Sequence, residues 1–187
     1  MMGEIIELDD VDSLGTGAVG TPGKRAFYIQ ARTENAQLTV LVEKEQVALL
    51  ATEAVAFLDR IADDYPETPA SVPDTDTTLR EPTVPLFRAR LIGLGFDPER
   101  SRVLIELRER STEDEDEDED EEEEDLDEHS DDDDDEEAGY VARIYATRAQ
   151  VRAMAARGAE AVAGGRPACP LCDMPMDPSG HICPRWN

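Results

Sequence analysis

Apolar and polar positions in the first part of the chain predict three strands and a helix. Residues 4–8 predict a short strand, and residues 27–32 and 38–42 are rich in the β-branched and aromatic side chains that favour strands. The polar residues 33–35 between these two segments are typical of a hairpin turn. Over residues 44–64, apolar residues recur at spacings of three and four, which predicts an amphipathic helix. These positions are Val47, Leu50, Ala54, Leu58 and Ile61.

A proline-rich stretch separates this group from a second hairpin. Five prolines from Pro66 to Pro85 predict a surface loop. Residues 86–94 and 102–108 then predict two paired strands, and Asp97-Pro98-Glu99-Arg100 supplies residues typical of the turn between them. In the first of these strands Phe87, Ala89 and Leu91 alternate with arginines, so we expect these three apolar side chains to be buried.

The last regular elements repeat an earlier pattern. Residues 140–145 predict a strand, and the capping-box spacing of Thr147 and Gln150 predicts a helix that runs to about Ala163. The same order of strand, polar link, Gln-Val and helix occurs 104 residues earlier, at residues 41–47. The repetition predicts an α+β fold in which two hairpin-plus-helix units form an antiparallel sheet with both helices on one face. The alternative is that there is no internal repeat, and that the similarity is only what any strand leading into a helix shows.

Charge divides the chain further. The 187 residues include 45 Asp and Glu against 18 Lys and Arg, a net charge of −27. Residues 113–137 hold 22 acidic residues and no basic one, which leaves −5 on the remainder. Such a tract cannot bury apolar surface, so we expect residues 112–137 to be a disordered insertion. The single α+β domain then comprises residues 1–111 and 138–166, with a separate tail at residues 167–187.

The charge and the apolar pattern also limit partners and location. Binding of the whole molecule to nucleic acid or to an anionic membrane is disfavoured, because both need a positive field. No apolar run approaches 18 residues, and no basic-then-apolar leader precedes residue 20. We therefore expect a cytoplasmic protein without membrane contact. The acidic tract is a tolerated insertion without function, a segment that attracts a basic partner, or a weak adsorber of divalent cations.

The three cysteines and one of the two histidines lie in the tail and predict a metal site. Cys169 and Cys172 have C-x-x-C spacing, and His181 and Cys183 follow after a segment with two prolines and a glycine that can fold back. Three thiolates and one imidazole are the ligands of a closed, tetrahedral, structural Zn²⁺ site. A tail this short needs such a staple, because it cannot bury a core. We expect a small zinc-knuckle-like tail.

Two other chemistries compete with a structural zinc. C-P-x-C also occurs in thiol redox proteins, but only fifteen residues follow Cys172, too few for the βαβ unit in which that motif normally lies. Residues 15–20 match G-x-G-x-x-G, yet a predicted strand rather than a helix follows, so we expect a flexible or turn-making glycine-rich loop from Gly15 to Gly23. Lys24 and Arg25 beside that loop leave open a phosphorylated small-molecule ligand.

Arginines on the second hairpin could form a basic stripe. Arg102 and Arg108 lie on its second strand, and Arg88 and Arg90 lie on the first. One alternative is a solvated sheet face whose arginines pair with Glu99 and Glu106, and another is that they pair with the chain's own acidic tract.

The tail also resembles a known family. Cys169-Pro-Leu-Cys172, Asp177-Pro-Ser-Gly-His181 and Cys183-Pro-Arg185 are similar to the C-terminal CPLC…DPxGHxCPR signature of an uncharacterised actinobacterial family. Residues 27–32, 43–47 and 87–93 resemble it as well. The resemblance implies a domain of unknown function and supplies no catalytic residues.

Together these features predict a non-enzymatic binding or adaptor protein with a structural zinc. With His129 in the acidic tract and His181 in the predicted metal site, no histidine remains to activate a nucleophile, and we assign no catalytic residue. We expect an unknown protein partner, which would be basic if the acidic tract attracts it. Its binding surface would be the arginine-bearing sheet face, the zinc tail with Trp186, or the acidic tract. The alternatives are an enzyme or binder acting on a phosphorylated small molecule, and a thiol redox protein.

Overall fold

The computed structural model describes residues 4–67, 75–109, 139–166, 168–174, 176 and 181–186. The predicted disordered insertion at residues 112–137 lies outside these ranges. The described elements, in chain order, are β1 (Ile5–Leu8), β2 (Ser13–Val19), β3 (Ala26–Arg32), β4 (Gln37–Val42), α1 (Lys44–Asp64), β5 (Phe87–Arg88), β6 (Leu91–Asp97), β7 (Arg102–Arg108), β8 (Val141–Ala146) and α3 (Arg148–Ala163).

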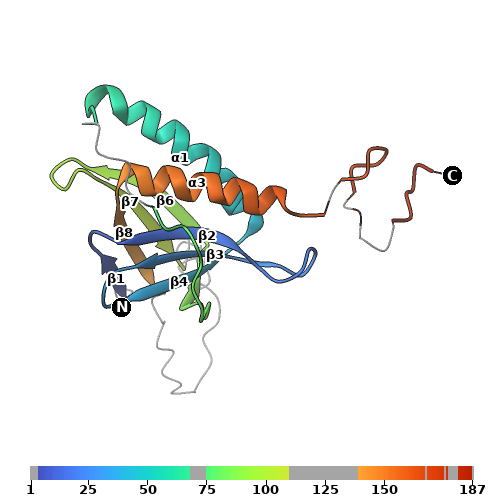
Figure 1. Cartoon of the computed structure of the whole chain (residues 1–187), viewed down its shortest axis with the longest axis horizontal. Coiled ribbons are helices and arrows are strands. Elements are labelled where there is room, and N and C mark those ends of the chain that lie inside the picture. The colour runs from blue at the N-terminus through green and yellow to red at the C-terminus, as the bar shows by residue number, and fades with distance from the viewer. Residues whose placement is uncertain are drawn as a thin grey trace, which may run out of the picture.

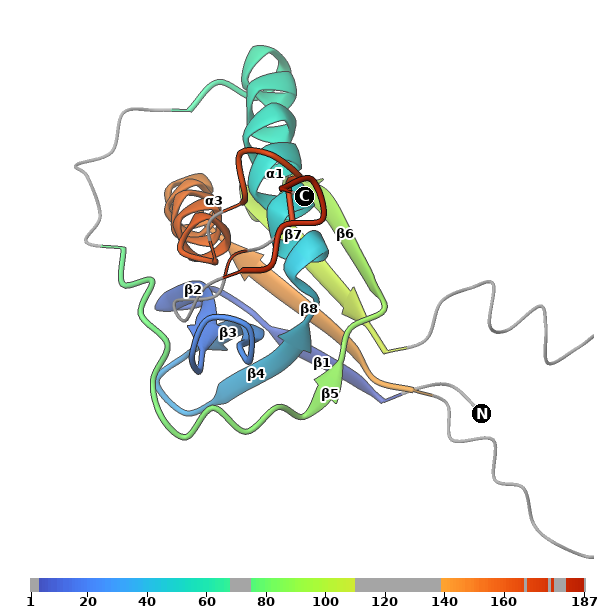
Figure 2. The same ribbon diagram turned by 90° about the vertical axis from the view of Figure 1, so that its right-hand side faces the viewer.

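The α+β class is confirmed, with the strands divided between two sheets rather than gathered in one. One sheet has the order β1-β8-β7-β6 and the other β2-β3-β4-β5. The three-stranded antiparallel meanders β2-β3-β4 and β6-β7-β8 form their centres. Each sheet then gains a parallel edge strand, because β1 pairs with β8 and β5 pairs with β4 (Figure 2).

The two halves of the chain repeat the same plan and exchange one strand. Each half runs as a short strand, a three-stranded meander and a helix, ending in α1 or α3. The short strand β1 precedes the first meander but pairs with the second, and β5 precedes the second meander but pairs with the first. The predicted internal repeat is therefore present in the topology, and the exchange ties the halves together.

Both helices lie on the same side of the sheets and contact each other (Figure 1). The apolar periodicity that predicted α1 identifies its buried side: Val47, Leu50, Ala54 and Leu58 are buried, and Ile61 packs against the core. The predicted bounds of α1 are confirmed. α3 begins at the expected capping box, where the Thr147 hydroxyl accepts the Gln150 N–H, and Gly164 caps its end.

The predicted glycine-rich loop is wrong over most of its length, because Ser13–Val19 form strand β2. Gly15 is needed there for a close approach: a Cβ on it would lie 2.4 Å from the Thr77 carbonyl oxygen. The described part of the proline-rich stretch is thus packed onto β2. It is further held by Gln30, whose amide side chain donates to the Arg80 carbonyl and accepts the Arg80 N–H. The actual turn lies at Gly20–Arg25, with positive φ at Gly20 and Gly23.

The predicted strand over residues 86–94 is also corrected. Phe87–Arg88 pair with β4 in one sheet, and the chain crosses to the other sheet before Leu91. Leu91, expected to be buried, is 43% exposed, because the crossing breaks the alternation that begins at Phe87 and Ala89. The predicted turn is confirmed, with the Asp97 carboxylate accepting the N–H groups of Glu99 and Arg100.

Candidate metal centre

The four residues predicted to hold a metal come together in the tail that follows α3. One ligand atom from each of Cys169, Cys172, His181 and Cys183 lies within 4.8 Å of the other three. The Sγ atoms of Cys169 and Cys183 are 3.9 Å apart, and Cys172 Sγ is 3.1 Å from Nε2 of His181. Cys169 is buried and the other three are half-buried.

Short hydrogen bonds shape the backbone around the first two cysteines. The Cys169 carbonyl accepts the Asp173 N–H at 2.8 Å, and the Cys169 N–H donates to the Met174 carbonyl at 2.8 Å. This closes a tight turn that presents both thiols on one side. The guanidinium of Arg185 donates to the Leu171 carbonyl, which joins the His181–Cys183 segment to that turn. These hydrogen bonds thus hold the two parts of the motif together as a single cluster.

One of these separations matches that of two thiolate ligands on a tetrahedral ion. A Zn–S bond of about 2.3 Å places two thiolate ligands about 3.8 Å apart, which is close to the observed Sγ–Sγ distance. Hydrogen bonds from the backbone N–H groups of Leu171 and Cys172 lower the pKa of the Cys169 thiol to about 7, so its thiolate is accessible near neutral pH. Burial instead raises the pKa of the Cys172 thiol. The cluster could therefore hold a metal ion, with all four positions filled by the protein.

The surface of the tail carries apolar residues that sequence analysis noted only at Trp186. Ile182 is 97% exposed and Trp186 is 79% exposed, the highest values among the exposed large apolar residues that the structure describes. Leu171 and Met174 are also exposed. Their exposure could have been predicted from the sequence, because they lie inside or beside the cysteine motif, and turns of this size leave the side chains between the cysteines pointing outward.

The other sequence candidates have different outcomes. The G-x-G-x-x-G segment lies in and just after β2 and leads to β3, so it forms no cradle at a helix N-terminus. Arg25 lines a cavity that also contains Lys44 and Arg166, whereas Lys24 is not among its lining residues. Lys44 and Arg166 were missed, because they come from the start of α1 and the chain after α3.

The predicted arginine stripe is largely an ion-paired sheet face. Glu106 on β7 pairs with Arg108 at 2.8 Å and with Arg143 at 2.9 Å. Arg102 pairs with Asp10 at 2.6 Å. Arg88 lies in the other sheet and pairs with Glu43, so the four arginines do not form one stripe.

No helix in the described part of the chain has the length and apolar character needed to cross a membrane.

Comparison with known proteins identifies the family. No curated protein and no solved structure gives a significant match to the chain. The sequence profile of the family described as "Protein of unknown function (DUF3090)" matches residues 6–183, which include all four residues of the Cys/His cluster. The chain therefore belongs to the DUF3090 family.

Proposed function

We propose that this protein is a non-enzymatic binding protein whose C-terminal tail, closed by a structural zinc ion, presents an apolar surface to a protein partner. The observation that carries the proposal is the convergence of three thiols and one imidazole within 4.8 Å. Thiolate and imidazole together favour zinc over calcium or magnesium, which prefer oxygen ligands. Reduced cysteines of this kind fit a cytoplasmic protein.

The ligand set supports a structural rather than a catalytic ion. Catalytic zinc sites keep one position for water or substrate, and four protein ligands leave none. The tail also has little else to hold it: among its described residues only Cys169 is buried. A segment with so little core is organised by its metal, so metal binding and folding of the tail should be coupled.

The exposed side chains of the tail support a partner. Trp186 and Ile182 keep most of their apolar surface in water. Tryptophan is one of the residue types enriched among those that dominate binding energy at protein interfaces. The acidic tract would speed the approach of a partner with a basic surface, because opposite charge steers association.

Capture with matched surface variants tests the proposal. The zinc-loaded full chain is used as bait in a reduced lysate of the expressing cells, beside the tail variant Ile182→Ser/Trp186→Ala. The control is Leu49→Ser/Val84→Ser, which removes two exposed apolar side chains from the domain instead of the tail. We expect one partner to be lost with the tail variant and after chelation, and retained with the control. Titration of that purified partner then measures its Kd.

Equal recovery of every captured protein by the tail variant and the wild type would overturn the proposal. Recovery of nothing above background would do the same. Capture through a mixed disulfide, seen only without reductant, would support the thiol redox interpretation instead.

A further inference from the structure

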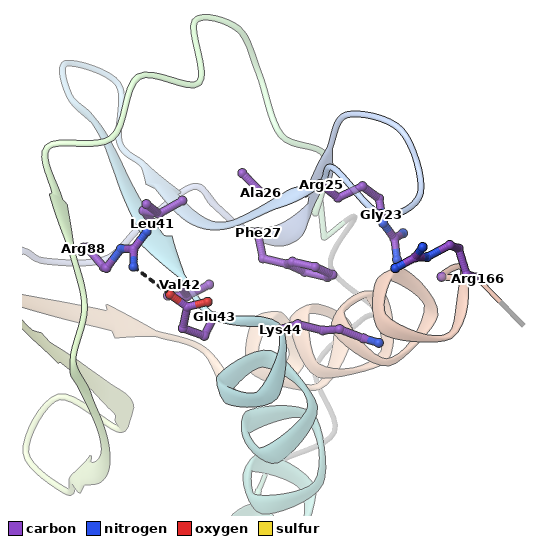
Figure 3. A pocket seen from close by; sticks show the side chains of 11 residues that line it. Gly23, Arg25, Ala26, Phe27, Leu41, Val42, Glu43, Lys44, Arg88 and Arg166 are labelled. Carbon is purple, nitrogen blue, oxygen red and sulfur yellow. Dashed lines mark ion pairs between the residues drawn. The ribbon is translucent and has the colours of Figure 1, made fainter. Parts of the chain in front are cut away.

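Three cationic side chains from three separate parts of the chain meet at the end of α3, and none of the four cysteine and histidine residues of the tail lines the same cavity. Arg25 comes from the turn that leads into β3, Lys44 is the first residue of α1, and Arg166 follows α3. They line a cavity of about 390 Å³ (Figure 3). That volume lies in the range of small-molecule sites, roughly 300–1,000 Å³.

The packing around Gly165 and Gly23 brings these cations close together. The guanidinium of Arg25 would lie 3.0 Å from a Cβ on Gly165, and the ammonium of Lys44 would lie 3.8 Å from the same point. The Arg166 guanidinium covers Gly23, where a Cβ would be 3.2 Å from its Cζ. Gly23 also has a φ of +91°, so both its conformation and its lack of a side chain permit this approach.

The cavity is positive in a strongly negative chain. Its lining holds four cations, including Arg88, and one carboxylate, Glu43. That carboxylate is already engaged, since it pairs with Arg88 at 2.9 Å (Figure 3). No carboxylate of the described residues forms an ion pair with Arg25 or Lys44, although the chain has 45 acidic residues. Neighbouring like charges repel, so an anion bound between Arg25 and Lys44 would stabilise their approach.

Part of the arrangement serves the fold. α3 has no basic residue in its last turn, and Arg25 donates to the Ala161 carbonyl there while its guanidinium lies over the Phe27 ring. This accounts for one cation at the negative end of the helix. It does not account for Lys44, which belongs to α1 and whose ammonium extends toward the same place (Figure 3).

We infer that this cavity is a binding site for the phosphate group of a small phosphorylated molecule. Guanidinium and ammonium donors are the side chains that bind phosphate most strongly. The apolar side chains of Phe27 and Val42 line the remainder of the cavity. The site lies outside the metal cluster and is independent of the function proposed for the tail.

The chain contains only two lysines, and this allows a direct footprint. The intact protein is reductively methylated in phosphate-free buffer, and labelling of Lys44 is compared with labelling of Lys24 by mass spectrometry. The probes are inorganic pyrophosphate and a panel of phosphate monoesters with their dephosphorylated counterparts, all at constant ionic strength. At a probe concentration of about ten times Kd, we expect Lys44 labelling to slow about tenfold and Lys24 labelling to stay unchanged. The dephosphorylated counterparts should not protect.

Calorimetry with a matched pair of variants gives a second readout. Lys44→Gln should weaken pyrophosphate binding about tenfold or more, as expected for loss of a charged hydrogen bond. Lys24→Gln removes the same charge from an exposed residue outside the lining and should change the Kd by less than about twofold in physiological salt.

Two results would overturn the inference. One is that no probe protects Lys44 from labelling more than it protects Lys24. The other is that deletion of residues 113–137 exposes Lys44 to labelling while phosphate does not protect it. The chain's own acidic tract would then be the occupant.

Discussion

Gln46 and Gln150 lie 104 residues apart and make the same pair of contacts at the starts of α1 and α3. Each side-chain carbonyl accepts the N–H of the residue that caps its own helix, at 2.8 Å in both cases. Each side-chain amide then donates to the chain segment just after the exchanged edge strand. Gln46 reaches the carbonyls of Ala89 and Arg90, and Gln150 reaches that of Val11 at 2.6 Å. A glutamine thus completes the capping box and holds the segment after the exchanged strand in both halves.

The glutamine pair predicts unequal losses of stability. Gln150 is buried and Gln46 is half-buried, so Gln150→Ala leaves the Val11 carbonyl without its partner in the interior. We expect Gln150→Ala to lower the free energy of unfolding by about 1–3 kcal/mol and Gln46→Ala to lower it less. Denaturant titration measures both, with the exposed Gln37→Ala as control. A larger loss for Gln46→Ala than for Gln150→Ala would contradict this account.

Two strand glycines should respond differently to a methyl group. Gly15→Ala places Cβ against the Thr77 carbonyl and must displace the segment at residues 75–86, at a cost of about 1–3 kcal/mol. Gly93 is its matched control on β6, where the nearest atom to a new Cβ lies 3.9 Å away. Gly93→Ala should be neutral or slightly stabilising. Limited proteolysis should cut residues 75–86 faster only in Gly15→Ala, and equal cutting in both variants would refute the packing role.

The same segment should respond to acid. Hydrogen bonds from the side chain and backbone of Thr78, and then from Arg32, hold the pKa of Asp76 well below its usual range. Because the folded pKa is lower than the unfolded one, the Asp76 contribution is present above about pH 4 and is lost as the pH falls further.

Asp76→Asn should therefore remove part of the acid dependence of unfolding. At neutral pH we expect a loss of about 1–3 kcal/mol, because the buried Arg32 loses a charged partner at 2.6 Å. Below about pH 4 the difference from the wild type should shrink. Asp59→Asn, which changes an exposed carboxylate on α1, should cost little at either pH. If the free energies of unfolding of Asp76→Asn and the wild type differ by the same amount from pH 7 to pH 3, the Asp76 carboxylate does not cause the acid dependence.

Most of the secondary structure and the whole Cys/His cluster could be predicted from local patterns. α1 follows from apolar periodicity, α3 from its capping box, and the four residues of the cluster from C-x-x-C and H-x-C spacing over fifteen residues. Each of these signals acts within a few turns of chain. β2 was missed because Gly15 and Gly17 suggest a loop, whereas Gly15 serves the close approach of Thr77.

Relationships between distant segments were not predictable in the same way. The exchange of β1 and β5 depends on which strands meet in space, and nothing at residues 5–8 specifies β8 as their partner. The cationic cavity was found in part, through Arg25. Lys44 and Arg166 belong to it because the end of α3 meets the start of α1, and this contact is visible only in the folded chain.

The measurement that tests the central claim most directly is the metal content of the protein purified without added metal. We expect one zinc ion per chain, absent from the Cys169→Ser/Cys172→Ser variant, whose tail should also become sensitive to protease. Asp173→Asn is the control: it removes a neighbouring carboxylate, and asparagine tolerates the left-handed backbone (φ 59°) of that residue, so its zinc should remain. Metal-free wild-type protein with a Cys169–Cys172 disulfide would contradict the structural zinc and favour thiol redox chemistry.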